Sequence, residues 1–249
     1  MLAMNVKIEV ELAPRIVAEE EGFLVAYKPP GYHTTPLKSG NNAQQTLLEF
    51  CARSYPELRK VKGWNPWEGG SVHRLDAETH GLVLFARTQV FMDSIREQQS
   101  QGRFLKKYHA LCIARDHPLG AGYPPNPLAG MEPFPVGRDI SSGFRPFGPG
   151  GKAVRPTLDS SDYRTQLLSM APTGGLWSLG VQISRGFRHQ IRCHLAWIGY
   201  PIANDRVYGD AGAIPTAPPL ALRAQGIAFY DPQSGTERTY LLADLPYPG

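Results

Sequence analysis

Cysteine is scarce in this sequence, which contains only Cys51, Cys112 and Cys193. The three lie far apart, and no two of them form the C-x-x-C spacing of redox or zinc-binding sites. This pattern argues against a disulfide-stabilised scaffold and against a zinc site built from cysteines. We expect the three cysteines to be reduced side chains in the core.

Long apolar segments are also lacking. The run from Leu82 to Ala86 is about a quarter of the ~20 residues that a membrane-spanning helix needs. The first residues, MLAMNVKIEVELAPR, lack a basic stretch followed by an apolar one, so they do not resemble a signal peptide. No internal repeat, phosphate-binding loop or G-x-G-x-x-G motif occurs. We therefore expect a cytoplasmic protein without membrane contact.

Neither sign of charge dominates strongly. The net charge is +4 and the pI is about 9.0, but 18 of the 26 basic residues are arginine. The planar guanidinium suits phosphate groups better than an ammonium does. Nucleic acid is therefore a candidate partner.

The hydrophobic pattern indicates strands and helices around one core. From Trp177 to Ile183 apolar and polar residues alternate, as in a sheet with one buried face. The DPQSG segment indicates the turn of a hairpin. We predict strands at 23–27, 82–86, 106–114, 177–183, 227–230 and 236–242, and helices at 46–55, 88–102 and about 191–198. The predicted class is α+β, with a mixed, mainly antiparallel sheet and flanking helices.

Residues 117–151 are crowded with proline and glycine and show no periodicity. Since proline disrupts helices and central strands, we predict a long surface excursion rather than a domain boundary. A disordered insert without a role is the alternative. The aromatic and basic residues of this segment could contact a ligand. They are Tyr123, Phe134, Arg138, Phe144 and Arg145.

A charged pair stands directly before an apolar segment in GGSVHRLDAETHGLVLFAR. In an extended chain, Arg74 and Asp76 project to one side while His73 and Leu75 project to the other. Flanking glycines allow close backbone approach, and the strand from Leu82 anchors the segment to the core. We interpret the pair as part of a rigidly mounted site, and a surface ion pair is the simpler alternative.

A second basic cluster, RGFRHQIR, lies where a strand changes to a helix. Arg188 and Arg192 are four residues apart and are predicted to share a helix face. One of them could hold an aspartate in its ionised form. His189 and His194 do not indicate a metal site, because their spacing puts them on different sides of a helix. We expect no bound metal.

Several motifs follow one another along the chain: KPPGYHTTP at 28–36, SVHRLDAETHGLVLFA at 71–86, KKYHAL at 106–111, GKAV at 151–154 and GFRHQIRCHLAWIGYPIANDRVYG at 186–209. In these motifs the sequence resembles the RluA-type pseudouridine synthases. The resemblance implies the pseudouridine synthase catalytic fold as a single domain at 14–249, with 117–151 as an insertion. Residues 1–13 are then an N-terminal extension, and we expect the catalytic domain itself to hold RNA.

The resemblance further implies an isomerase that converts uridine in rRNA or tRNA to pseudouridine without a metal or organic cofactor. Asp76 would be the nucleophile, and Arg192 would be its ionic partner. Arg74 would enter the gap left by the flipped base. Tyr108 would pack on the uracil with its hydroxyl available for proton transfer, and Ile191 would form an apolar wall.

Further RNA contacts are expected around these positions. The sequence departs from the common family pattern at His80, Phe187 and Arg188, which affects local RNA contacts but not the catalytic residues. We expect a monomer that acts on an RNA stem-loop without an obligatory protein partner. Besides Arg74 and Ile191, the residues expected to bind RNA are His73, Lys106, Lys107, Arg188 and His189, with Arg96 and Arg103 as further candidates.

Two other classes of function stay open from the sequence. One is an RNA-binding protein of the same fold without activity, which the presence of Asp76, Tyr108 and Arg192 disfavours. The other is a carboxylate-based nucleosidase or glycosidase, which needs a second acid, and Glu78 is the nearby candidate. Attack of the carboxylate on the sugar and attack on the base are both compatible with the sequence.

Overall fold

The computed structural model describes residues 10–37, 45–115, 119, 122–131, 136–209, 214 and 218–242. The described chain forms two compact units. The Asp76 unit comprises 10–106 and 223–242, and the Arg192 unit comprises 107–222. Such units can belong to one folding domain, so the single catalytic domain at 14–249 stays a prediction.

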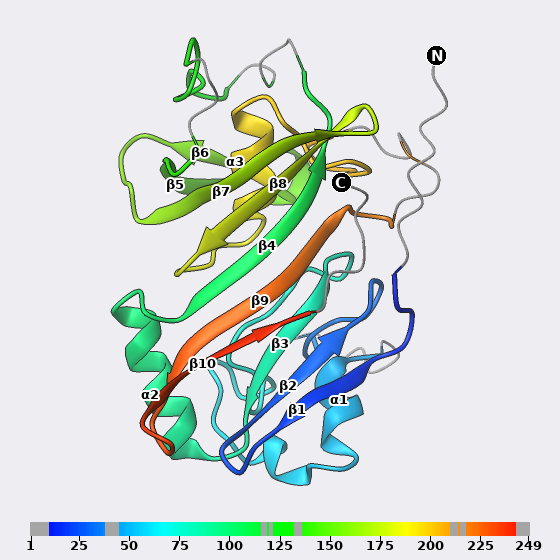
Figure 1. Ribbon diagram of the computed structural model, residues 1–249, viewed down its shortest axis with the longest axis vertical. Coiled ribbons are helices and arrows are strands. Elements are labelled where there is room, and N and C mark those ends of the chain that lie inside the picture. The colour runs from blue at the N-terminus through cyan, green and yellow to red at the C-terminus, as the bar shows by residue number, and fades with distance from the viewer. Residues whose placement is uncertain are drawn as a thin grey trace. The chain divides into compact units, whose positions relative to one another are not determined.

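The Asp76 unit consists of strands with helices packed on them (Figure 1). Its elements are β1 (Arg15–Glu19), β2 (Phe23–Lys28), α1 (Leu47–Ala52), η1 (Pro56–Arg59), β3 (His80–Ala86), α2 (Gln89–Ser100), β9 (Leu222–Asp231) and β10 (Thr236–Leu241). The strand order is β1-β2-β3-β9-β10, and β3 and β9 form the parallel pair. Gly81 in β3 has φ 125°, and a Cβ there would lie 2.2 Å from the Ala224 carbonyl oxygen. Glycine is therefore required where β3 meets β9.

The centre of this unit is formed by β2 and β3, in which every residue is buried. Phe23 stacks on Phe91 of α2 with the ring centroids 4.9 Å apart, and it meets Phe229 of β9 edge-on at 5.1 Å. Thr88 caps α2, as predicted, by accepting a hydrogen bond from the Phe91 N–H. The segment that precedes β3 is therefore anchored in the most buried part of the unit.

The Arg192 unit contains one longer helix beside its strands (Figure 1). Its elements are most of β4 (Leu105–Cys112), then β5 (Asp139–Phe147), η2 (Pro149–Gly151), β6 (Ala153–Thr157), β7 (Tyr163–Thr173), β8 (Leu176–Ile183) and α3 (Gln190–Trp197). The strand order is β4-β8-β7-β5-β6, and the pairs from β8 to β6 are antiparallel. The helix α3 packs against β6 and β7 with all of its residues buried. It ends before Gly199, whose φ of 92° suits a helix C-terminus.

The strand β5 corrects the prediction for the Pro/Gly-rich segment. Asp139–Ser142 pair with β7, and Gly143–Phe147 pair with β6, so β5 is an internal strand. Each half of β5 has one paired side, and Pro146 lies where its missing N–H is tolerated. The prediction that 117–151 holds no central strand was therefore wrong for 139–147. Phe134 lies outside the described residues.

The other predicted strands and helices are confirmed, with shifts at their ends only. The predicted α+β class with a mixed, mainly antiparallel sheet is therefore confirmed. Cys51, Cys112 and Cys193 are buried with free thiols, as expected. Among the described residues, no helix has the length and apolar character needed to cross a membrane.

Candidate active site

Asp76 lies in a loop that leads directly into β3. The Thr79 N–H donates to the Asp76 carbonyl oxygen at 3.1 Å, which closes a turn just before the strand. The residue is half-buried. The loop therefore joins a wholly buried strand without a flexible spacer.

Lys28, the last residue of β2, fastens the backbone next to Asp76. Its side chain is wholly buried, and its Nζ donates to the carbonyl oxygens of Pro29 at 3.1 Å, Tyr32 at 2.7 Å and Ala77 at 2.9 Å. Burial lowers the pKa of Lys28 to about 7, and attraction to the Asp76 carboxylate opposes this fall. KPPGYHTTP was recognised from the sequence as a family motif, but this role of Lys28 was not predicted. The feature of the sequence that could have indicated this role is a lysine at the end of an otherwise apolar strand.

Thr34 holds the other side of Asp76. Its hydroxyl accepts a hydrogen bond from the Leu75 N–H at 3.0 Å and donates to the Leu75 carbonyl oxygen at 3.3 Å. Both neighbours of Asp76 are therefore hydrogen-bonded to the segment 28–34. A backbone held on both sides restricts where the carboxylate can lie, which is a requirement for a preorganised nucleophile.

Lys28→Met should change how stability depends on pH. The pKa of Lys28 is about 7 in the folded chain and ordinarily 10.5, so between these values the unfolded chain keeps a proton that the folded chain has lost. The contribution of Lys28 to the free energy of unfolding therefore rises with pH above about pH 7, and the variant should lack this rise. Urea unfolding of both proteins between about pH 7 and pH 9 measures the difference.

Lys60→Met, at an exposed position of the same unit, is the matched control for this experiment. Its difference from the wild type should not vary with pH. A Lys28→Met difference that is equally constant would show that the buried ammonium has an ordinary pKa.

Arg74 is exposed but held at one end. Its Nη1 lies 2.9 Å from Glu68 Oε1, and the side chains are 59% and 5% exposed, respectively. The Asn65 N–H donates to the other carboxylate oxygen of Glu68 at 3.0 Å. The guanidinium is thus held by a buried carboxylate while it faces solvent beside the Asp76 loop. Glu68 was not predicted from the sequence.

Of the residues expected to bind RNA, Lys106 is buried in the Asp76 unit and His73 is half-buried there. His73 Nε2 accepts a hydrogen bond from the Leu84 N–H at 3.2 Å, and its ring centroid lies 5.5 Å from that of Phe104. Burial lowers the pKa of His73 to about 3, so the imidazole is neutral at neutral pH. Lys106 Nζ lies 5.3 Å from the Phe104 ring centroid, and burial lowers its pKa to about 8. The RNA contacts of both residues stay predictions, in which His73 brings no charge.

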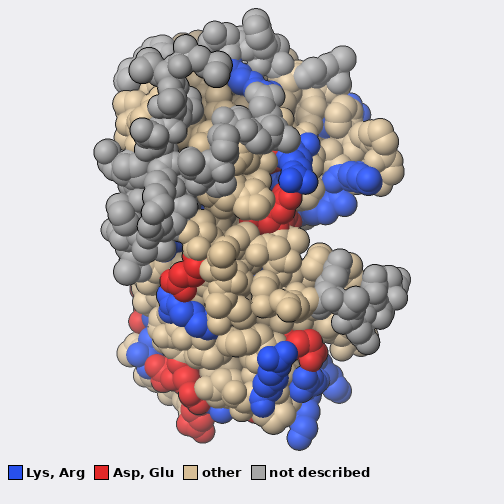
Figure 2. Space-filling model, turned by 90° about the vertical axis from the view of Figure 1, so that its right-hand side faces the viewer, with Lys and Arg blue, Asp and Glu red and all other residues tan. Residues whose placement is uncertain are grey.

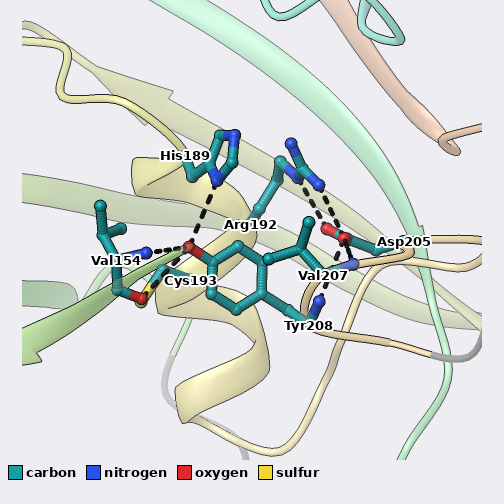
Figure 3. Close-up of polar contacts among 7 residues, drawn as sticks. All are labelled: Val154, His189, Arg192, Cys193, Asp205, Val207 and Tyr208. Carbon is teal, nitrogen blue, oxygen red and sulfur yellow. Dashed lines mark hydrogen bonds and ion pairs between the residues drawn. The ribbon is translucent and has the colours of Figure 1, made fainter. Parts of the chain in front are cut away.

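Arg192 points from α3 to Asp205 (Figure 3). Its Nε donates to Oδ2 at 2.7 Å and its Nη2 donates to Oδ1 at 2.8 Å. The side chains of Arg192 and Asp205 are 5% and 0% exposed. Burial raises the pKa of Asp205, but the Arg192 guanidinium and the N–H groups of Val207 and Tyr208 outweigh it and lower the pKa. Asp205 is therefore ionised, and the two-point contact sets the orientation of Arg192.

Tyr208 completes this cluster (Figure 3). Its hydroxyl accepts a hydrogen bond from the Val154 N–H at 2.8 Å, donates to the Val154 carbonyl oxygen at 3.2 Å and lies 3.3 Å from His189 Nδ1. The Cys193 thiol donates to the same carbonyl at 3.4 Å. The Arg192 guanidinium carbon lies 5.7 Å from the Tyr208 ring centroid. These contacts tie α3 to β6 and leave Arg192 little freedom.

The prediction that Arg188 and Arg192 share a helix face was wrong. His189 has left-handed backbone angles, φ 58° and ψ 17°, so α3 begins at Gln190 and Arg188 precedes it. The Arg188 Nη2 donates instead to the carbonyl oxygens of Gly151 and Ala153. A left-handed residue leaves no trace in a hydrophobic pattern, which is why the spacing was misleading.

Tyr108, Lys107 and Ile191 are placed by regular elements. Tyr108 is buried in β4 on the side opposite to Lys107, which is half-buried. Ile191 is buried in α3. Their expected roles at the uracil and the RNA stay predictions.

The predicted site residues thus fall into two groups. Asp76, Arg74 and His73 share one unit, and Arg192, Ile191 and His189 share the other. The expected ion pair between Asp76 and Arg192 stays a prediction. Asp205 and Tyr208 were not predicted from the sequence, although both lie in the motif at 186–209.

Comparison with known proteins first defines the class of fold. Human RNA Pseudouridylate Synthase Domain Containing 1 matches with a TM-score of 0.63 at 18% identity, over 94% of this chain and 84% of that one. A second human structure, RNA Pseudouridylate Synthase Domain Containing 4, matches with a TM-score of 0.57 at 19% identity, over 93% and 88%. The chain therefore has the fold of pseudouridylate synthases.

The sequence then defines the family. The family described as RNA pseudouridylate synthase matches residues 22–197. An uncharacterized RNA pseudouridine synthase of Chloroflexus aurantiacus is 33% identical over 88% of this chain, and ribosomal large subunit pseudouridine synthase D of Nitrosomonas europaea is 29% identical over 94%. The chain spans 62% of the length of each. Dual-specificity RNA pseudouridine synthase RluA of Vibrio cholerae is 25% identical over 94% of this chain and 84% of its own length. This chain belongs to the RNA pseudouridylate synthase family and is of the RluA type, as predicted.

Proposed function

We propose that the chain is an RNA pseudouridine synthase that converts uridines of structured rRNA or tRNA to pseudouridine, with Asp76 as the nucleophile. The proposal rests on how Asp76 is held: Lys28 and Thr34 form hydrogen bonds with the backbone on both sides of the aspartate in the HRLD motif. A carboxylate whose backbone is held on both sides is suited to nucleophilic attack. We further propose that the enzyme acts as a cytoplasmic monomer without an obligatory partner.

The proposed reaction keeps every atom of the uridine. The bond between the anomeric carbon and N1 of uracil breaks, the base turns, and a bond from the same carbon to C5 forms. C5 loses its hydrogen as a proton, and N1 gains a proton. Asp76 attacks the sugar or the base, Arg192 keeps Asp76 ionised, and Tyr108 and Ile191 hold the uracil.

The orientation of Arg192 follows from its partner. Asp205 engages Nε and Nη2, so one edge of the guanidinium is held by a buried carboxylate. An arginine held in this way can stabilise an anion at a defined place without losing side-chain entropy during the reaction. Asp205 is therefore a positioning residue in this proposal, and Arg192 is the residue that meets Asp76.

Tritium release from RNA labelled at C5 of uridine tests the proposed function. The isomerase releases the label because C5 exchanges its hydrogen for a bond to the sugar. A nucleosidase would free uracil without releasing tritium, and an RNA-binding protein would do neither. Either of these results with the wild-type chain would overturn the proposal.

Arg74→Ala should reduce activity more on a paired uridine than on an unpaired one. The variant keeps Asp76 but lacks the cation that fills the vacated stack, so the few kcal/mol of unstacking go uncompensated in a duplex. The ratio of kcat/KM on a duplex-embedded and a single-stranded uridine measures the effect. Arg59→Ala, which removes an exposed arginine paired with Glu49 at 2.6 Å in the same unit, is the control. An equal loss on both substrates would mean that Arg74 does not replace the base.

RNA affinity should fall as the salt concentration rises, because lysine and arginine side chains that bind phosphates displace the counterions condensed on the RNA. The slope of log K against log salt is about −0.7 for each phosphate contacted on a single strand. On the face shown in Figure 2, several basic side chains lie beside acidic ones, so only part of the positive charge is available to phosphates. Filter binding at a series of potassium chloride concentrations gives the slope. A dissociation constant that does not respond to salt would rule out phosphate contacts by these residues.

A further inference from the structure

An exposed aromatic and basic patch lies on the Asp76 unit and has no part in the chemistry above. It consists of the exposed residues Trp64, Lys60 and Lys62, which are close in sequence, and of the half-buried Arg96, and we call it the Trp64 patch. Trp64 is 63% exposed, and within the described segment 45–75 it is the only exposed large hydrophobic side chain. The exposed indole with the Arg96 guanidinium over its ring offers a surface on which a base could stack.

Arg96 of α2 covers one face of the Trp64 ring. Its guanidinium carbon lies 5.0 Å from the ring centroid, and the exposure of Trp64 leaves the opposite face to solvent. The guanidinium is held by the Lys62 carbonyl oxygen at 2.8 Å and by Asp93 at 3.3 Å. The Lys62 N–H donates to the side chain of Gln89 at 2.9 Å. The contacts with α2 therefore set the orientation of the ring before any ligand binds.

The loop that carries Trp64 is closed on itself and connected to Arg74. A Cβ on Gly63 would lie 2.6 Å from the Gly69 carbonyl oxygen, so the two ends of the loop touch. The Asn65 N–H donates to the Glu68 carboxylate at 3.0 Å, and the same carboxylate lies 2.9 Å from the Arg74 guanidinium. The backbone of this loop is therefore linked to Arg74 through the Glu68 carboxylate.

We propose that the Trp64 patch is a stacking site at which the Asp76 unit binds an unpaired nucleotide of the RNA. The proposal rests on the proposed function. An exposed indole with a cation on its far face stacks on any base, and Lys60 and Lys62 suit the adjoining phosphates. A protein interface has an apolar centre, which a single indole among cations does not provide.

Binding of an oligouridylate tests the proposal. In the wild type, stacking should quench tryptophan fluorescence, and Trp64→Ala should weaken binding about tenfold, within the range for one base–aromatic stack. Trp64→Phe keeps an aromatic ring, so its affinity for oligouridylate should fall less than that of Trp64→Ala. A blunt RNA duplex has no unpaired base, so Trp64→Ala should bind it as the wild type does. The deficit on oligouridylate should persist at high salt, because stacking releases few counterions.

Leu241→Ala is the matched control, since it removes a 56% exposed apolar side chain from β10 of the same unit. It should bind both probes like the wild type. Thermal unfolding of each variant shows whether the fold is kept, and Trp64→Phe carries the test if Trp64→Ala unfolds.

The failure of this inference differs from the failure of the proposed function. If the wild type releases tritium but Trp64→Ala binds oligouridylate normally, the stacking site is wrong and the proposed function stands. If the wild type releases no tritium but Trp64→Ala still weakens oligouridylate binding, the stacking site stands alone. Equal losses on oligouridylate and duplex would also overturn the stacking site.

Discussion

Asp76→Asn is expected to abolish pseudouridine formation while the fold and RNA affinity stay intact. The amide keeps the size and nearly the shape of the side chain, but it has no negative charge and no nucleophilic oxygen. We expect turnover to fall on the order of 10⁴-fold or more, as it does when other enzymes lose a nucleophile. Tritium release measures the turnover, and filter binding measures the affinity.

Glu78→Gln is the matched control for this variant. It makes the same chemical change in the same half-buried stretch of the chain, two residues after Asp76. Turnover should stay within a few-fold of the wild type, since Glu78 has no role in the proposed mechanism. Conversion of uridine by Asp76→Asn would contradict the nucleophile assignment, and a large loss with Glu78→Gln would revive the mechanism with two acids.

Asp205→Asn should strongly destabilise the protein. The variant leaves the Arg192 guanidinium buried without its counter-charge, and breaking such a pair typically costs about 3–5 kcal/mol. Urea unfolding gives the change in the free energy of unfolding. Asp139→Asn is the control, because Asp139 pairs with Arg164 at 3.6 Å in the same unit and both side chains are exposed. Surface pairs of this kind contribute little, so the control should unfold like the wild type.

The double variant Arg192→Met/Asp205→Asn separates stability from catalysis. It removes the guanidinium that Asp205→Asn leaves buried without a counter-charge, and the amide oxygen can still accept hydrogen bonds from the Val207 and Tyr208 N–H groups. The double variant should therefore regain much of the stability that Asp205→Asn loses. The double variant should be inactive, because it lacks the arginine expected to form the ion pair with Asp76. An active double variant would remove Arg192 from the mechanism, and wild-type stability of Asp205→Asn would mean that the pair contributes no stabilising charge interaction.

The sequence by itself led to the family and to part of the regular structure, whereas β1, β5, β6 and β7 were not predicted. The apolar runs at 23–27 and 82–86 and the alternation at 177–183 correspond to β2, β3 and β8, because burial repeats over neighbouring residues in strands. The helix cap at Thr88 was also predictable, because it depends only on residues within one helical turn. The order of the motifs led to the pseudouridylate synthase family and to Asp76 as the candidate nucleophile, since a motif combines residue types at a fixed spacing.

Only the tertiary structure decided which groups these residues contact. Lys28 reaches the Ala77 carbonyl, 49 positions further along the chain, and Arg192 binds Asp205, which lies beyond the end of α3, because folding brings these segments together. The strand β5 likewise depends on β6 and β7, and its local composition of proline and glycine indicated the opposite. Hydrogen bonds and ion pairs between distant segments depend on the packing of the whole unit, and local periodicity contains no information about that packing.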